Sequence, residues 1–267
     1  MNSGRTSTSH SRRRISNLMG KIEVSHLNVT YKQGNTAFKA LNDIDFTIQA
    51  GEFVCIVGHS GCGKSTLLKL IAGLDMPTSG SILNDNKTIS GPSVDRSVVF
   101  QQYSLFPWMT VLQNVTFAVN KTGRFSKSEA KERAVYFLKR TGLEHVLDAW
   151  PYQLSGGMRQ RTAIARTLAM DSPYLLLDEP FGALDTKIRG QLQILLQDLW
   201  KESGKTVIFV THDLDEAMIL GSRIVFIEDG RIQYEKQIDT SINCCCRQQA
   251  GRADCLALKE EMTRWFQ

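Results

Sequence analysis

The sequence feature that most limits the possible folds is the glycine-rich loop at residues 58–65, Gly-His-Ser-Gly-Cys-Gly-Lys-Ser. It follows a continuous apolar run at 53–57, as in a buried parallel strand, and a helix is expected from about Lys64 to Gly73. Small residues in such a loop let backbone N–H groups surround a phosphate, helped by the positive end of the helix. The pattern predicts a nucleotide site in which Lys64 reaches the β- and γ-phosphates and Ser65 binds Mg²⁺.

The predicted ATP contacts come from consecutive residues of this loop and of the first helical turn. They are Gly58, His59, Ser60, Gly61, Cys62, Gly63, Lys64, Ser65 and Thr66. His59 and Cys62 occupy spacer positions and receive no chemistry of their own, although a cysteine at a helix N-terminus can be a reactive thiolate.

Two acidic residues follow a second buried strand. The apolar run 175–177 leads directly into Asp178 and Glu179, at the end of a strand where open α/β sheets bind ligands. Neighbouring residues of a strand point to opposite faces, so one acid can hold Mg²⁺ while the next addresses the attacking water. We assign Asp178 to the metal and Glu179 to the role of general base; the alternative is a pair of strand-end acids that face solvent.

A second pair of glycines opens a helix after Ser155, within the sequence Leu-Ser-Gly-Gly-Met-Arg-Gln-Arg. The first loop is already an anion cradle, and this second one resembles the signature sequence of ABC-type ATPases. The resemblance runs from about Lys21 to Gly230, and the order and intervals of the motifs agree with it. Residues 58–65 resemble the family's Walker A motif, or P-loop, and residues 178–185 resemble its Walker B motif and D-loop.

The resemblance implies roles for further residues. Gln101 resembles the Q-loop glutamine that senses Mg²⁺, and His212 resembles the switch histidine that stabilises the transferring phosphoryl group. Tyr31 resembles the aromatic residue that stacks on adenine, with Phe38 as the alternative. In this family two ATPase domains pair head to tail. The residues implied to complete the partner's site are Ser155, Gly156, Gly157 and Asp185.

The expected fold is α/β: a P-loop NTPase core, with a RecA-like mixed sheet and flanking helices, plus an N-terminal antiparallel β subdomain and a helical insert. Strands are expected near 22–24, 29–31, 44–48, 207–210 and 224–227. The insert is expected at about 103–154, with capping boxes at Thr110/Gln113 and Ser126/Glu129. The expected divisions are a disordered basic leader at 1–20, an ABC ATPase domain at 21–240, and a tail at 241–267 with a helix near 257–265.

Charge is unevenly distributed along the chain. The net charge is +5, but the first 18 residues hold four arginines and no acid, which leaves 28 basic and 27 acidic residues elsewhere. A near-neutral body argues against a nucleic-acid partner. The leader resembles an organellar transit peptide, although a disordered leader or an over-long start before Met19 is favoured. The adjacent Cys244, Cys245 and Cys246 suit one tetrahedral metal poorly.

Several details resemble one branch of the family, the bacterial importers of nitrate, sulfonate and taurine. They are the phosphate loop, Met158 of the signature, and Phe-Pro-Trp-Met-Thr-Val at 106–111. The segment around Phe106 and Trp108 is where this family docks a permease; its apolar residues also fit a subdomain core.

The resemblance implies an ATP-binding and ATP-hydrolysing importer subunit, a translocase at the cytoplasmic face of the cell membrane. It would energise uptake of a small anionic solute with ATP and Mg²⁺. Its partners would be a second ATPase subunit, permease subunits and, through them, a solute-binding protein. The alternatives are a non-transport soluble ABC ATPase and an ABC exporter subunit. The solute itself is set by the permease and binding protein, so this sequence does not name it.

Overall fold

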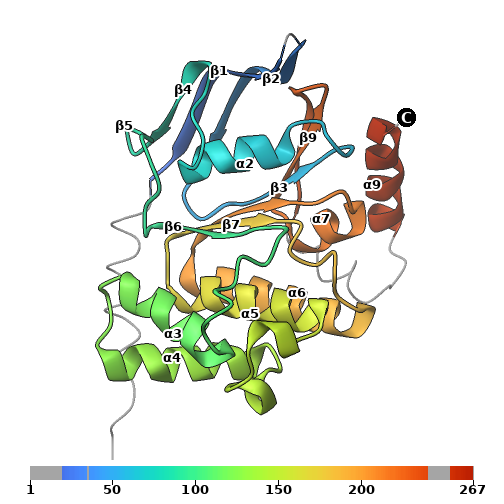
Figure 1. The fold of residues 1–267 in the computed structure, drawn as a ribbon. Helices are drawn as coiled ribbons and strands as arrows, with labels where there is room; N and C mark the ends of the chain where they lie inside the picture. The colour runs from blue at the N-terminus through green and yellow to red at the C-terminus, as the bar shows by residue number, and fades with distance from the viewer. Residues whose placement is uncertain (1–19, 35, 240–252, 267) are drawn as a thin grey trace, which may run out of the picture. The chain divides into compact units, whose positions relative to one another are not determined.

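The computed structural model describes residues 20–34, 36–239 and 253–266 (Figure 1). They divide into two compact units: the first is Met1–Pro92 with Gln197–Gln267, and the second is Ser93–Leu196. The basic leader, apart from Gly20, lies outside the described residues, as do the three adjacent cysteines of the tail.

The first unit contains a four-stranded antiparallel sheet in the order β2-β1-β4-β5. The strands are β1 (Ile22–Gln33), β2 (Thr36–Ile48), β4 (Ser79–Asn84) and β5 (Lys87–Thr88). The predicted alternation of β2 is confirmed, since Ile44, Phe46 and Ile48 are all buried. The prediction of separate strands at 22–24 and 29–31 is wrong. One strand, β1, spans both segments, because bulges at its register shifts absorb the break in alternation.

The second group of strands in this unit has the order β10-β9-β3-β8. These are β3 (Phe53–Val57), β8 (Thr206–Val210), β9 (Arg223–Glu228) and β10 (Arg231–Gln237). β3 lies between β8 and β9 and runs parallel to both, and all residues of β3 and β8 are buried. β10 returns antiparallel to β9 after the turn at Asp229 and Gly230, both at positive φ.

Helix α2 (Lys64–Ala72) follows β3 and lies between the antiparallel sheet and the parallel strands of the first unit (Figure 1). It buries Leu67, Leu68 and Ile71. The helix ends as predicted at Gly73, whose φ of 75° is the left-handed conformation of a C-terminal cap. The burial of β3 and α2 fixes the loop between them at residues 58–63.

The second unit pairs two parallel strands, β6 (Arg96–Val99) and β7 (Tyr174–Asp178), and carries three main helices. These are α3 (Val111–Lys121), α4 (Lys127–Arg140) and α5 (Gly156–Ala169), with short 3₁₀ turns η1 (Glu144–Val146) and η2 (Pro151–Gln153). Both predicted capping boxes are present, at Thr110/Gln113 and Ser126/Glu129. α3, α4 and α5 pack on one another, so α5 adds to the helical insert expected at 103–154.

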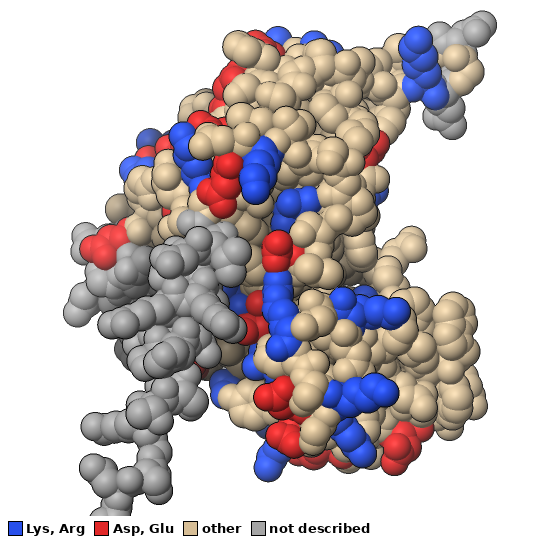
Figure 2. All heavy atoms as spheres, turned by 90° about the vertical axis from the view of Figure 1, so that its left-hand side faces the viewer, with Lys and Arg blue, Asp and Glu red and all other residues tan. Residues whose placement is uncertain are grey.

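The remaining helices of the described residues are α6 (Thr186–Ser203), α7 (Leu214–Leu220) and α9 (Ala253–Thr263), and η3 (Arg264–Phe266) follows α9. The helix expected near 257–265 therefore begins four residues earlier and changes to a 3₁₀ turn at its end. No helix within the described residues combines the length and apolar character needed to cross a membrane. Basic and acidic side chains are interspersed on the face drawn in Figure 2, in keeping with the near-neutral body.

Candidate nucleotide site

The phosphate loop has a backbone that only glycine can supply at two positions. Gly58 has φ 153° and Gly63 has φ 108°. A Cβ at Gly58 would lie 2.1 Å from the carbonyl oxygen of Ile227, and one at Gly63 would lie 2.5 Å from that of Ala40. The predicted glycines are thus required by both conformation and close backbone packing.

Lys64 is 5% exposed and lies folded against its own loop. Its Nζ donates to the carbonyl oxygens of Gly58, at 2.8 Å, and His59, at 2.7 Å. The ammonium group is therefore held at the centre of the loop, where a phosphate would bind. Burial raises the pKa of the Cys62 thiol, although the nearby Lys64 lowers it in part. A reactive thiolate at Cys62 is therefore not supported.

The switch histidine candidate lies at the same strand edge as the phosphate loop. The N–H of Thr211, just beyond β8, donates to the carbonyl oxygen of Ile56 in β3 at 3.1 Å. Thr211 Oγ1 in turn donates to the buried Glu216 at 2.8 Å, and Asp213 caps α7. His212, between these two anchored residues, is exposed. The first unit thus places the loop and His212 at the carboxyl ends of two paired parallel strands.

A cavity of about 440 Å³ adjoins the phosphate loop within the first unit. Its lining combines three residues of β2, the phosphate loop and the turn after β9: Phe38, Lys39, Ala40, His59, Ser60, Gly61, Cys62, Glu228, Asp229 and Gly230. Phe38 is 59% exposed. It supplies the cavity with an aromatic ring, as a nucleobase site needs.

Tyr31 lies opposite Phe38 in the β1–β2 pairing and is 41% exposed. Its hydroxyl donates to Asp75 at 2.6 Å. The pKa of Tyr31 is raised, mainly by burial and then by Asp75, while a hydrogen bond with Thr66 lowers it. Tyr31 is thus tied to Asp75 beyond the end of α2 and to Thr66 in its first turn, whereas Phe38 lines the cavity beside the phosphate loop.

The second unit brings together the acidic pair and the Q-loop glutamine. Asp178 ends β7 and is 5% exposed, and Gln101 lies just beyond the paired strand β6. Gln101 Nε2 donates to Glu179 Oε2 at 3.5 Å. Glu179 has φ 44°, a conformation that is uncommon outside glycine, asparagine and aspartate. The left-handed backbone, and not strand alternation alone, sets the direction of Glu179.

The signature motif forms the N-terminus of α5, as predicted. Ser155 is the N-cap, and its hydroxyl accepts from the N–H of Met158 at 3.3 Å. A Cβ at Gly157 would lie 3.2 Å from the carbonyl oxygen of Ala183, so a larger residue would press on the segment before α6. Asp185 accepts from the N–H of Ile188 at 3.0 Å and therefore caps α6.

Sequence reasoning missed the residues that connect the segment after Gln101 to the signature helix. The Arg159 guanidinium lies 5.4 Å from the ring centre of Tyr103, and Arg166 donates to the carbonyl oxygen of Ser104 at 2.8 Å. Within this unit the Q-loop segment and α5 are therefore physically joined. The sequence signal was weak, because a tyrosine and two arginines at these spacings fit many surfaces.

Asn114 was also missed as an organiser of the uncharged segment 106–110. It is fully buried, and its Nδ2 donates to the carbonyl oxygens of Phe106, Met109 and Thr110 at 2.9–3.2 Å. Its Oδ1 accepts from the N–H of Phe106 at 2.8 Å. This one amide fixes the backbone of a segment that leaves Trp108 exposed. A lone asparagine in a predicted helix gives no sequence warning of such a role.

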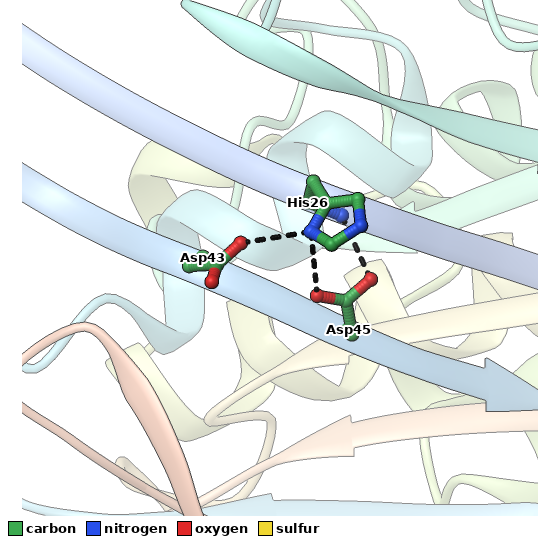
Figure 3. A group of neighbouring side chains, drawn as sticks. All are labelled: His26, Asp43 and Asp45. Carbon is green, nitrogen blue, oxygen red and sulfur yellow. Dashed lines mark hydrogen bonds and ion pairs between the residues drawn. The ribbon is translucent and has the colours of Figure 1, made fainter.

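His26, Asp43 and Asp45 form a separate group of exposed ligand-type side chains on β1 and β2 (Figure 3). His26 Nδ1 lies 3.1 Å from an oxygen of Asp43 and 3.3 Å from one of Asp45, whose other oxygen accepts the His26 N–H. The Asp43 hydrogen bond and the Asp45 charge raise the pKa of His26. Because a metal-binding imidazole must lose its proton, this environment favours an ion triad.

The fold, the phosphate loop and the acidic pair at the end of β7 are those of a P-loop nucleotide hydrolase. Comparison with known proteins gives the family: the ABC transporter family matches residues 41–182 of this chain, which is more than half of it. This protein belongs to that family. It is an ATP-binding ATPase, and its fold is that of an ABC ATPase cassette.

Three similar proteins support this assignment. An uncharacterized ABC transporter ATP-binding protein of Methanocaldococcus jannaschii is 50% identical over 82% of each chain. The nitrate import ATP-binding protein NrtD of Synechocystis is 46% identical, also over 82% of each. A solved dimeric ATP-binding cassette in a post-hydrolysis state, bound to ADP and phosphate, shares 39% identity with a TM-score of 0.77, covering 82% of this chain and 99% of the other.

Proposed function

We propose that this chain energises the uptake of a small inorganic or organic anion, of the nitrate, bicarbonate, sulfonate or taurine kind, through a partner permease. The observation that carries the mechanism is the presence of two glycine cradles in one chain, each opening a helix, at residues 58–65 and at Ser155. The proposed location is the cytoplasmic face of the cell membrane, where the chain binds the permease peripherally.

The first unit supplies the proposed nucleotide-binding half. The loop N–H groups and the N-terminus of α2 would receive the β-phosphate. The buried Lys64 would exchange its two carbonyl partners for phosphate oxygens, a stronger charge-assisted contact. The base would stack on Tyr31, with Phe38 as the alternative platform. His212 would stabilise the γ-phosphoryl group during transfer.

The second unit supplies the proposed hydrolytic half. Glu179 would take the proton of the attacking water, and Gln101, its hydrogen-bond partner, would report the occupancy of the site. The proposed Mg²⁺ ligands are Ser65, Gln101 and Asp178. Hydroxyl, amide and carboxylate oxygens are the hard donors that Mg²⁺ prefers, so the donor set fits the ion. Mg²⁺ would neutralise phosphate charge.

The signature residues act across a head-to-tail dimer in this proposal. Ser155, Gly156, Gly157 and Asp185 of one protomer would cover the γ-phosphate held by the Lys64 of the other. The dimeric cassette that resembles this chain supports the pairing. ATP would then hold two protomers together, and hydrolysis would release them, which gives the permease two alternating states.

The relatives support the proposed permease and anion. Proteins named for nitrate import and for bicarbonate transport are 43–50% identical to this chain. The exposed Trp108, on the segment fixed by Asn114, is the proposed contact with the permease. A solute-binding protein would deliver the anion to the permease from the other side of the membrane.

Uptake by cells whose native copy is replaced by Glu179→Gln tests this proposal. We expect uptake of labelled nitrate, bicarbonate or taurine to be lost for one of these anions, and a multi-span membrane protein to co-purify with the tagged chain. Cells that carry the wild-type copy with the same tag are the control. Unchanged uptake of all three anions, together with no co-purifying membrane protein, would overturn the importer proposal.

A further inference from the structure

The turn η3, which follows helix α9, contacts the phosphate loop within the first unit. The ring of Phe266 lies edge-on to that of His59, with centroids 5.1 Å apart. Phe266 and Trp265 both lie against Phe226 of β9, at 4.8 and 6.2 Å, and Trp265 stacks on Tyr234 at 5.4 Å. An aromatic cluster thus joins η3 to the two strands that follow the switch-histidine helix and to the loop itself.

His59 connects this cluster to the nucleotide machinery. Its carbonyl oxygen accepts from Lys64 Nζ at 2.7 Å, and the residue also lines the cavity beside the loop. The position of His59 therefore bears on where Lys64 is held. Phe266 is the residue outside the loop that contacts the His59 ring most closely among the described aromatic pairs.

Two ion pairs hold α9 in this position. Lys236 of β10 donates to both carboxylate oxygens of Glu261 at 2.8 and 2.9 Å. Lys259 lies 2.6 Å from a carboxylate oxygen of Asp215, in the first turn of α7. These ion pairs therefore join α9 both to β10 and to α7, the helix that begins two residues after His212. Leu258 and Met262, one turn apart on α9, are both buried.

We infer that Phe266 is a positioning residue for nucleotide binding, which acts through His59 to hold the phosphate loop in its binding geometry. A loop that is fixed before the nucleotide arrives loses less conformational freedom on binding. Docked α9–η3 therefore strengthens nucleotide affinity, and loosening of this segment weakens it. The inference rests on the proposed role of the phosphate loop. It adds a residue from outside the motifs to that site.

The test compares Phe266→Ala with Phe266→Tyr in the full chain. An edge-on aromatic pair is typically strong enough that its loss should weaken ADP binding, measured by calorimetry, by about threefold to tenfold. The KM for ATP should rise by a similar factor, while kcat stays within about twofold. Phe266→Tyr, which keeps the ring, should bind like wild type. Unchanged or tighter ADP binding by a folded Phe266→Ala protein would overturn the inference.

Two controls separate this role from general stability. Leu256→Ala alters a 57% exposed residue of the same helix and should leave affinity unchanged. If Phe266 acts through His59, the double variant His59→Ala/Phe266→Ala should bind no more weakly than His59→Ala alone; additive losses would contradict that route. Lys64→Ala separates the two proposals: if it binds ADP normally, the loop proposal itself fails, whatever Phe266 does.

Discussion

The two units contribute to the proposed site in different ways. In the first, the phosphate loop is built from backbone groups, and the proposed phosphate ligand Lys64 is buried and bound to its own loop. In the second, Gln101, Ser155 and Asp185 are exposed at the ends of strands and helices. The proposed binding half therefore has its loop and lysine fixed by contacts within the first unit. The proposed hydrolytic half instead has exposed side chains, which would act on a bound nucleotide or on the nucleotide of a partner subunit.

This difference predicts a separation of effects. Changes to the phosphate loop and the aromatic candidates of the first unit should alter nucleotide affinity, because these groups would contact the ligand in the ground state. Changes to Glu179 and to the signature residues of the second unit should alter turnover and leave affinity nearly unchanged, because these groups would act on the transition state or on a partner's nucleotide. Substitutions in each unit test this separation, from the largest expected effect to the smallest.

Glu179→Gln should lower kcat by about 10²–10⁴ while ATP affinity stays within about threefold, because the change keeps the shape and removes the base. A stable ATP-bound dimer should then appear on gel filtration. Steady-state ATPase assays and calorimetry check the two quantities. Wild-type turnover in this variant would show that Glu179 is not the general base. It would also contradict the expected separation of affinity and turnover effects between the two units.

Lys64→Ala should reduce nucleotide affinity by about 10²-fold, since it deletes the buried positive charge beside the phosphates. Calorimetry with ADP and with ATP measures the loss. Melting temperature should change little, because the hydrogen-bond partners of Lys64 Nζ among the described residues all belong to its own loop: the carbonyl oxygens of Gly58 and His59 and the sulfur of Cys62. If the variant bound ATP with submicromolar affinity, the first unit would not be the binding half.

Replacing each of the two aromatic candidates in turn identifies the residue on which the base stacks. Loss of the stacking platform should weaken ATP binding by about tenfold, the scale of base–aromatic stacking. We expect this loss for Tyr31→Ala and a smaller one for Phe38→Ala, with binding measured for both ATP and GTP. A larger loss in Phe38→Ala would transfer the role to the residue that lines the cavity.

The ion triad of His26 predicts the smallest effect, and it concerns stability alone. The folded-state pKa of His26 is raised above 6.5. Its stabilising contribution is therefore complete below the unfolded pKa and is lost as the pH rises through the folded pKa. NMR titration of the imidazole should show the raised pKa, and Asp43→Asn should lower it. ATP affinity should be the same in both proteins, in contrast to the Lys64 and Tyr31 variants.

The sequence predicted the strand, the glycine loop and the helix around residues 58–65 almost completely, and the reason is physical. The glycines at 58 and 63 are needed because other residues would collide with neighbouring carbonyl oxygens. The glycine motif in the sequence therefore already specifies the backbone geometry of the loop. Capping boxes and the Gly73 cap are likewise local, since the residues that form them are close in sequence.

The rest depended on contacts between distant parts of the chain. No periodicity reveals that Asn114 holds the 106–110 backbone, or that Phe266 reaches His59 across more than two hundred residues. The left-handed Glu179 was missed because strand alternation assumes that the strand continues beyond Asp178. The single β1 strand was divided in two because its bulges interrupt the alternation.

The most direct test of the central claim mixes two variants, Ser155→Arg and Lys64→Ala. Ser155→Arg alone should bind ATP and fail to hydrolyse it, because the arginine would block closure of the signature over the partner's γ-phosphate. In a mixed dimer one composite site has an intact phosphate loop facing an intact signature from the other chain, so the mixture should recover ATPase activity that neither variant shows alone. Full activity of Ser155→Arg by itself would contradict the account.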